Sequence, residues 1–316
     1  MLNPRIRALF LVSVLLLIGC SQTGQVTRET KSTAGEKLRV VATTTIVGDI
    51  VHSIAGDWID LHILIPPGVD EHSFQYTPED VARVADADVV FMNGAGLETF
   101  MKPLVENAGQ HARVISVSDG IALMQPANTT GGNTPSGEQS FTAGDPHVWL
   151  DPNNTLVWTE NIAAALAELD PQHAVDYQAN AKGYQQNLAE LDHWIQQQVA
   201  QISVANRQLV TDHEIFTYFA NRYGFKQIGA LIPSYSTAAE PSAQELAKIE
   251  DAIRQYGVKA IFVGNTVNPD LSKRVAMDTG VSLILIYTGS LTDSAPAATY
   301  LDYMRYNVQA IVKALK

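Results

Sequence analysis

Residues 171–202 have the sequence PQHAVDYQANAKGYQQNLAELDHWIQQQVAQI, the longest helical pattern in the chain. Alanine, glutamine, leucine and glutamate favour helices, and Gly183 is the only glycine in this stretch. A helix of about 30 residues would be about 45 Å long, enough to run the length of a two-lobed protein. We therefore predict a single rigid helix that joins two halves of the chain.

On both sides of this stretch, short β-branched runs alternate with helical patterns, which indicates βα units and parallel sheets. The fold class expected is α/β, with two βα lobes built on central, mostly parallel sheets and joined by the long helix. The strands expected are 38–43, 59–65, 88–92, 113–117, 208–211, 260–263 and 282–287. Helices are expected at 46–55, from Pro78, at 97–107, 151–169, 214–223 and 241–256, and from about 297.

The amino terminus predicts export from the cytoplasm. Arg5 and Arg7 precede an apolar run from Ala8 to Ile18, the pattern of a secretory signal peptide. This run is too short for a membrane-spanning helix, which needs about 20 residues. Residues 17–20 (LIGC) resemble the lipobox of bacterial lipoproteins, which implies cleavage before Cys20 and a lipid anchor on that residue. The alternative is an ordinary secretory signal with a chance cysteine.

These patterns define the expected organisation and location of the chain. We expect an extracytoplasmic protein of the cell envelope, held to the membrane by lipid. The divisions expected are a signal peptide at 1–19, the lipidated cysteine and a flexible tether at 20–37, an N-terminal lobe at 38–170, the connecting helix at 171–203 and a C-terminal lobe at 204–316. Residues 126–144, rich in Gly, Thr, Ser, Pro and Asn, are expected to form a loop.

Composition excludes several classes of partner and site. Cys20 is the only cysteine, so the folded part can form neither a disulfide nor a cysteine-based zinc site. The formal net charge of −12 argues against nucleic acid as a partner, because binding to phosphates requires patches of lysine and arginine.

Three histidines are the candidate metal ligands. His72, His147 and His213 lie in the segments 68–74 (GVDEHSF), 145–149 (DPHVW) and 212–216 (DHEIF). They are far apart in the sequence, so only the tertiary fold can bring them together. Three neutral imidazoles that meet at one point form a site for a borderline divalent metal such as zinc.

These segments resemble those of a known family, the metal-binding solute proteins of bacterial ABC importers for zinc and manganese, which include lipoproteins once called adhesins. Residues 68–74, 145–152 (DPHVWLDP) and 212–220 (DHEIFTYFA) are similar to its three ligand loops, and 236–242 (STAAEPS) and 299–308 are similar to two further segments. The resemblance spans residues 38–316. It implies Zn²⁺, or alternatively Mn²⁺, as cargo, an ABC permease and its ATPase as partners, and a monomer.

The chain departs from the family pattern at two positions. The proline that usually precedes the first histidine is Glu71, and Gly289 stands where the family carries an aspartate as fourth ligand. Glycine has no side chain with which to bind a metal. Asp293 in the same loop, Glu240, or water or a backbone oxygen are the candidates for the fourth position.

The pattern predicts capture rather than catalysis. A zinc hydrolase also needs a general base and a substrate pocket, and the motifs show neither. We therefore expect a carrier that is not an enzyme. A surface-anchored zinc hydrolase and an adhesin are the alternative functions.

Overall fold

The structure, a computed structural model, describes residues 37–109, 111–125 and 144–316. Within it, residues 37–316 form one compact unit. The predicted signal peptide, Cys20, nearly all of the tether and most of the predicted loop at 126–144 lie outside the described residues.

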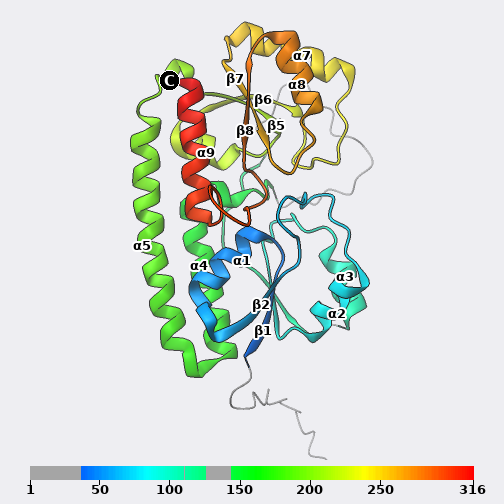
Figure 1. Ribbon diagram of the computed structural model, residues 1–316, viewed down its shortest axis with the longest axis vertical. Coiled ribbons are helices and arrows are strands. Elements are labelled where there is room, and N and C mark those ends of the chain that lie inside the picture. The colour runs from blue at the N-terminus through cyan, green and yellow to red at the C-terminus, as the bar shows by residue number, and fades with distance from the viewer. Residues whose placement is uncertain (1–36, 110, 126–143) are drawn as a thin grey trace, which may run out of the picture. The chain divides into compact units, whose positions relative to one another are not determined.

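The N-terminal half contains a four-stranded parallel sheet with the strand order β2-β1-β3-β4 (Figure 1). The strands are β1 (Leu38–Ala42), β2 (Ile59–Ile63), β3 (Val89–Met92) and β4 (Arg113–Ser116). The helices are α1 (Thr45–Ala55), α2 (Pro78–Asp86) and α3 (Met101–Ala108). Thr77 and Asp80 form a capping box that starts α2. The expected helix at 97–107 begins four residues later than predicted.

The C-terminal half contains a second four-stranded parallel sheet with the order β6-β5-β7-β8. The strands are β5 (Gln208–His213), β6 (Lys226–Ile232), β7 (Ala260–Gly264) and β8 (Ser282–Ile286). The helices are α6 (Thr217–Tyr223), α7 (Ala243–Tyr256), α8 (Asp270–Thr279) and α9 (Tyr300–Leu315). Strand β6 and helix α8 were not predicted from the sequence.

Two helices lie between these halves in the sequence, α4 (Pro152–Leu169) and the long α5 (Ala174–Val199). The predicted connecting helix is real but shorter, with 26 residues, because a 3₁₀ turn at Pro171–His173 comes before it. Three further 3₁₀ turns lie at Gly56–Trp58, Val148–Leu150 and Val204–Asn206.

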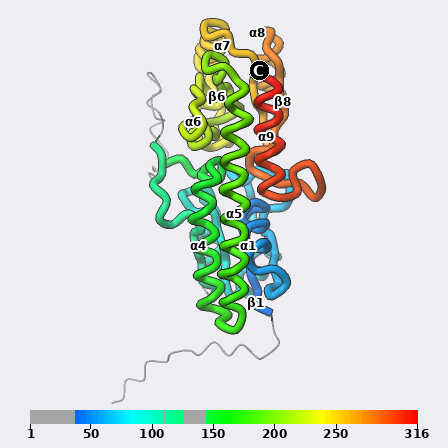
Figure 2. The backbone as a smooth tube through the Cα atoms, turned by 90° about the vertical axis from the view of Figure 1, so that its left-hand side faces the viewer, coloured from blue at the N-terminus to red at the C-terminus, as the bar shows by residue number. Residues whose placement is uncertain are grey.

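Helix α5 packs against α4, against α1 of the first half and against α9 of the second (Figure 2). Its buried residues recur every three or four positions along its whole length, which places them on one face. They are Tyr177, Ala181, Tyr184, Leu188, Leu191, Ile195 and Val199. The connecting helix is therefore fixed to both halves by packing.

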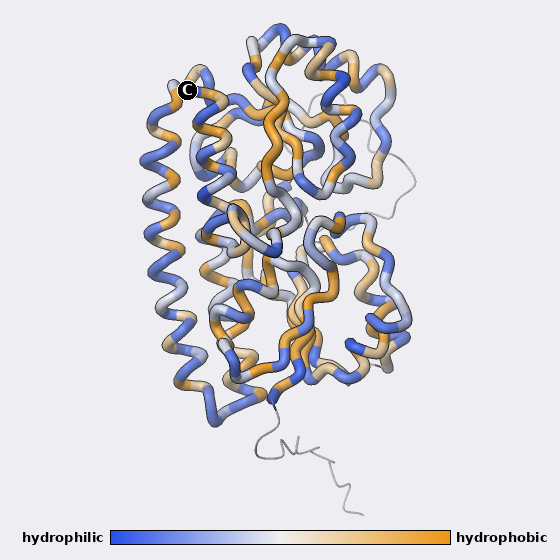
Figure 3. Tube along the Cα trace, in the orientation of Figure 1, coloured by the Kyte–Doolittle hydropathy of each residue, from blue (hydrophilic) through white to orange (hydrophobic). Residues whose placement is uncertain are grey.

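The apolar residues form one shared core and two local ones. The shared core joins α1, α4, α5 and α9 to both sheets. A local core lies between the first sheet and α2 and α3, and another between the second sheet and α7 and α8. In Figure 3 the strands contain the most hydrophobic segments. The inner strands β1, β3, β5 and β7 are the most buried, as expected for parallel strands covered on both faces.

Among the helices of the described residues, none has both the length and the apolar character required to cross a membrane.

Candidate metal centre

The three candidate histidines lie where strands of the two sheets end. His72 is in the loop that follows β2, His147 lies between β4 and α4, and His213 is the last residue of β5. Ligand sites in open parallel sheets form beyond the carboxyl ends of the strands. The structure brings the three together: each offers one nitrogen, and these nitrogens all lie within 4.8 Å of one another.

The distance between His72 and His147 and the angles between the three rings suit a single metal ion. Nε2 of His72 lies 3.1 Å from Nε2 of His147. Two nitrogens bound to one tetrahedral zinc at about 2.0–2.1 Å would be about 3.3 Å apart. The imidazole rings of all three pairs meet edge to face, with centroids 5.2–5.6 Å apart. Their nitrogens can therefore point to one position without the rings colliding.

Two of the histidines are oriented by a carboxylate of their own segment. Nδ1 of His147 donates to Oδ1 of Asp145 at 2.8 Å, and Nδ1 of His213 donates to Oδ1 of Asp212 at 2.6 Å. Each carboxylate also accepts the backbone N–H of its histidine. This arrangement leaves Nε2 of both rings free to bind a metal and fixes the direction in which it points.

Burial and charge set the protonation of the cluster. Burial holds the pKa of His147 well below its ordinary value, and the charge of His213 lowers it further. Burial also lowers the pKa of His72, and the charges of His147 and His213 lower it further. Burial opposes the charged form of His213 too, but Asp212 outweighs it and raises the pKa of His213. Two of the three imidazoles are therefore already neutral, the form that binds metal.

Glu71 fills the space that a side chain at position 289 would occupy. A Cβ atom added to Gly289 would overlap both carboxylate oxygens of Glu71. The two departures from the family pattern, one at residue 71 and one at residue 289, are therefore in direct contact. Both departures are visible in the sequence, but Glu71 and Gly289 are so far apart in the chain that the sequence alone does not show that they are in contact.

The environment of Glu71 fits a cation. Its side chain is buried, and burial raises its pKa to about 7. Oε2 of Glu71 and Nε2 of His213 are both buried, and neither has a hydrogen-bond partner among the described residues. The carboxylate lies outside the group of nitrogens within 4.8 Å, so binding a shared metal requires it to rotate. The donor set of three nitrogens and a nearby carboxylate fits a divalent metal.

The two carboxylates considered from the sequence lie elsewhere. Asp293 and Glu240 are both exposed to solvent, and neither belongs to the group of side chains that surrounds the three histidines.

The segment that carries His147 contacts both halves of the protein. Nδ2 of Asn93 donates to the carbonyl of Pro146, and the hydroxyl of Tyr218 donates to the carbonyl of Asp145. Nε1 of Trp149 donates to the carbonyl of Thr288. His147 is thus held in place from both sides.

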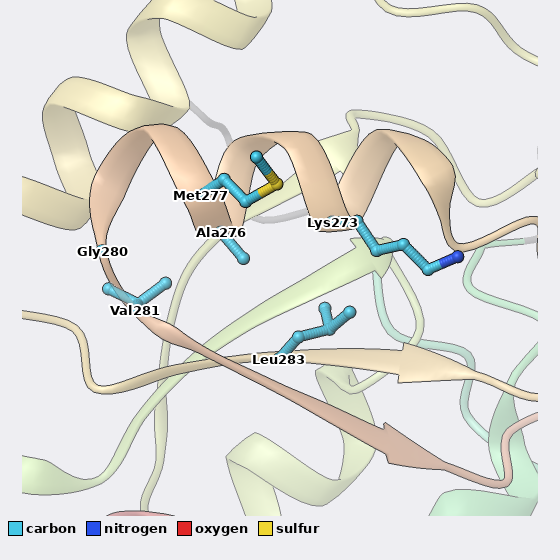
Figure 4. Close-up of a pocket in the computed structure, with 6 residues that line it drawn as sticks. All are labelled: Lys273, Ala276, Met277, Gly280, Val281 and Leu283. Carbon is cyan, nitrogen blue, oxygen red and sulfur yellow. The ribbon is translucent and has the colours of Figure 1, made fainter.

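A surface hollow beside α8 and β8 is a separate feature (Figure 4). It is lined by Lys273, Ala276, Met277, Gly280, Val281 and Leu283. None of the candidate metal ligands lines it, so it is no part of the metal centre.

Comparison with known proteins finds metal-binding relatives along almost the whole chain. A family described as "zinc-uptake complex component A, periplasmic" matches residues 40–314. The manganese-binding lipoprotein MntA of Halalkalibacterium halodurans is 33% identical over 310 residues, which cover 97% of each chain. The iron ABC transporter substrate-binding lipoprotein MtsA of Streptococcus pyogenes is 32% identical over 315 residues, 96% of each chain. The structure of the periplasmic zinc-binding protein TroA of Treponema pallidum superimposes with a TM-score of 0.77 at 27% identity, covering 89% of this chain and 99% of that one.

Proposed function

The chain belongs to the family of periplasmic zinc-uptake components, metal-binding substrate-binding proteins of ABC importers and not enzymes, and we propose that its cargo is zinc, held by His72, His147, His213 and Glu71. The protein would capture the ion outside the cytoplasm and deliver it to a membrane permease driven by an ATPase. The observation that carries this proposal is the convergence of the three imidazoles within 4.8 Å.

The donor atoms support zinc over manganese. Imidazole suits zinc, whereas manganese favours carboxylate, carbonyl and water oxygens. Three nitrogens and one carboxylate make a four-coordinate set of the kind zinc takes. The relatives named for manganese and iron show that cargo differs within the family, so the choice depends on the ligands of this chain.

The contact between Glu71 and Gly289 supports the fourth ligand. Because the two positions share one space, a carboxylate from residue 71 can serve where the family uses one from residue 289. Oε2 of Glu71 accepts no hydrogen bond from any described residue. Asp293 and Glu240 would each have to leave the solvent to reach the same place.

Titration of the protein that lacks residues 1–20 with zinc and manganese in competition tests the cargo. We expect one zinc per chain by elemental analysis and calorimetry, not displaced by an equal concentration of manganese. Preference for manganese would contradict the assignment of zinc. Absence of any stoichiometric metal would contradict the site itself.

A carboxylate swap tests Glu71. Glu71→Gln should weaken zinc binding by at least about tenfold. Loss of a residue that only hydrogen-bonds to a metal ligand lowers metal affinity by about 10–100-fold, and loss of a ligand itself should cost no less. Gly289→Asp alone should also weaken binding, since the new side chain collides with Glu71. The double variant Glu71→Ala/Gly289→Asp should recover most of the affinity. Wild-type affinity in Glu71→Gln would show that Glu71 is not a ligand.

We also propose that Cys20 carries a lipid anchor, that the organisation into signal, tether, two lobes and connecting helix is the one predicted from the sequence, and that the protein acts as a monomer. The LIGC sequence at 17–20 and the relatives named as lipoproteins support the anchor. Replacement Cys20→Ser should move the protein from the membrane fraction to the soluble fraction. Retention at the membrane would contradict the anchor. No observation favours the adhesin alternative.

A further inference from the structure

The three histidines differ in how they are shielded from solvent. His147 and His213 are almost completely buried, whereas His72 is only partly so. The residues before His72, from Pro66 to Val69, are exposed. Of the three histidines, His72 is therefore the one most open to solvent.

Asp70 organises this loop. Its Oδ1 accepts the backbone N–H of His72 at 3.0 Å, and its Oδ2 accepts the hydroxyl of Ser73 at 3.2 Å. The same Oδ2 accepts the hydroxyl of Thr237 at 2.5 Å. Thr237 lies between β6 and α7, in the other half of the protein. One carboxylate thus links the backbone of a candidate metal ligand to a segment of the C-terminal half.

A second bond joins the same loop to the C-terminal half of the protein. The backbone N–H of Gly68 donates to Oγ of Ser290, which is buried and lies near Thr45. The residues that follow Thr237, from Ala238 to Glu240, are exposed. Both bonds are partly buried and they reach the loop from different segments, so the bond between Thr237 and Asp70 can break while the bond between Gly68 and Ser290 stays.

We propose that Thr237 is a positioning residue that holds His72 at the metal through Asp70 and thereby limits how fast zinc leaves. This inference rests on the proposed zinc site. When the bond forms, the His72 loop is held against the segment between β6 and α7. When it breaks, His72 can swing away, while His147 and His213 stay oriented by Asp145 and Asp212.

The test is the rate at which zinc leaves the loaded protein when excess chelator is added, measured by stopped flow. Thr237→Val keeps the size of the side chain and removes the hydroxyl. It should release zinc about tenfold faster, at the lower end of what a hydrogen bond to a charged acceptor contributes. Thr237→Ser, which keeps the hydroxyl, should stay within about threefold of wild type on the same grounds.

Ser73→Ala is the matched control. It removes a hydrogen bond to the same oxygen of Asp70, but this bond lies within the His72 loop and does not reach the C-terminal half. Its release rate should stay close to that of wild type. In a His72→Ala background, Thr237→Val should not change the zinc affinity further, since the residue through which it acts is gone. A purely structural role for Thr237 would weaken binding in both backgrounds.

The outcomes separate the two proposals. Equal release from wild type and Thr237→Val, or equal acceleration in Ser73→Ala, would overturn the role of Thr237 and leave the zinc site intact. Failure of the wild-type protein to bind zinc would overturn both.

Discussion

The metal centre has two sides, which we call fixed and movable after the role proposed above for the loop of His72. On the fixed side, His147 and His213 are buried, and each is oriented by a carboxylate one or two residues away. On the movable side, no side chain orients the ring of His72 in this way among the described residues. Its loop is instead held by Asp70, which accepts a hydrogen bond from Thr237 in the C-terminal half.

This difference suits a protein that must both bind and release its cargo. Two ligands whose directions are already fixed lose little conformational freedom when metal arrives. The third can complete the shell or leave it by movement of one surface loop. Because α5 is packed along its length against both halves, a loop movement requires less disruption than a movement of the lobes.

The largest effect is expected on the fixed side. His147→Ala should lower zinc affinity by more than about 100-fold, which exceeds the loss expected when a residue that only orients a metal ligand is removed. His193→Ala, an exposed histidine on α5, is the control and should bind zinc as wild type does. Calorimetry gives both affinities, and circular dichroism checks the fold. Normal binding by His147→Ala would show that the fixed side is wrongly assigned.

An intermediate effect is expected away from the metal, at Asp49. This α1 carboxylate accepts the backbone N–H of Tyr300 at the start of α9, and burial raises its pKa to about 6 from 3.8. Because the folded protein holds this proton more tightly than the unfolded chain, its contribution to stability is present below about pH 4 and is lost as the pH rises through about 6.

Asp49→Asn tests that contribution. Relative to wild type, the free energy of unfolding of Asp49→Asn should rise by roughly 2 kcal/mol between pH 4 and pH 6.5, since one pKa unit is worth about 1.4 kcal/mol and part of the carboxyl still contacts water. Urea unfolding at several pH values measures this difference. Zinc affinity at pH 7 should not change, because the hydrogen-bond partners of Asp49 are Tyr184 and Tyr300 and not the proposed ligands. A pH-independent difference would contradict the raised pKa.

The smallest effect is expected at Asp145, which orients His147 without touching the metal. Asp145→Asn keeps an oxygen that can accept from Nδ1 of His147 but removes the charge. Zinc affinity should fall by about tenfold, the low end for outer partners of a metal ligand. A competition assay with a chromogenic chelator resolves this change. A loss as large as that of His147→Ala would mean that the orientation of the ring contributes as much as its bond to the metal.

The sequence predicted the three histidines because each lies in a local segment of recognisable composition, and the structure brings them together. It also predicted the α/β class and the connecting helix, since residues 171–202 contain one long uninterrupted pattern. Strand β6 was missed because Gly229 interrupts it, a glycine whose missing side chain makes room for Ile249. Helix α8 was missed because only Ser272, Val275 and Ala276 are buried along its ten residues, which leaves almost no apolar stripe.

The proposed fourth ligand could not be identified in advance for a different reason. Glu71 and Gly289 lie in different halves of the chain, and only the tertiary fold shows that one fills the space of the other. The same limit applies to Thr237, whose bond to Asp70 joins segments that no local pattern connects.

The most direct test of the zinc site is a crystal structure of the zinc-loaded protein with anomalous data at the zinc edge. We predict one zinc ion bound by Nε2 of His72, His147 and His213 and by the carboxylate of Glu71, each at about 2.0–2.2 Å. A zinc ion that lacks any of the three histidines, or that takes Asp293 or Glu240 in place of Glu71, would contradict the account.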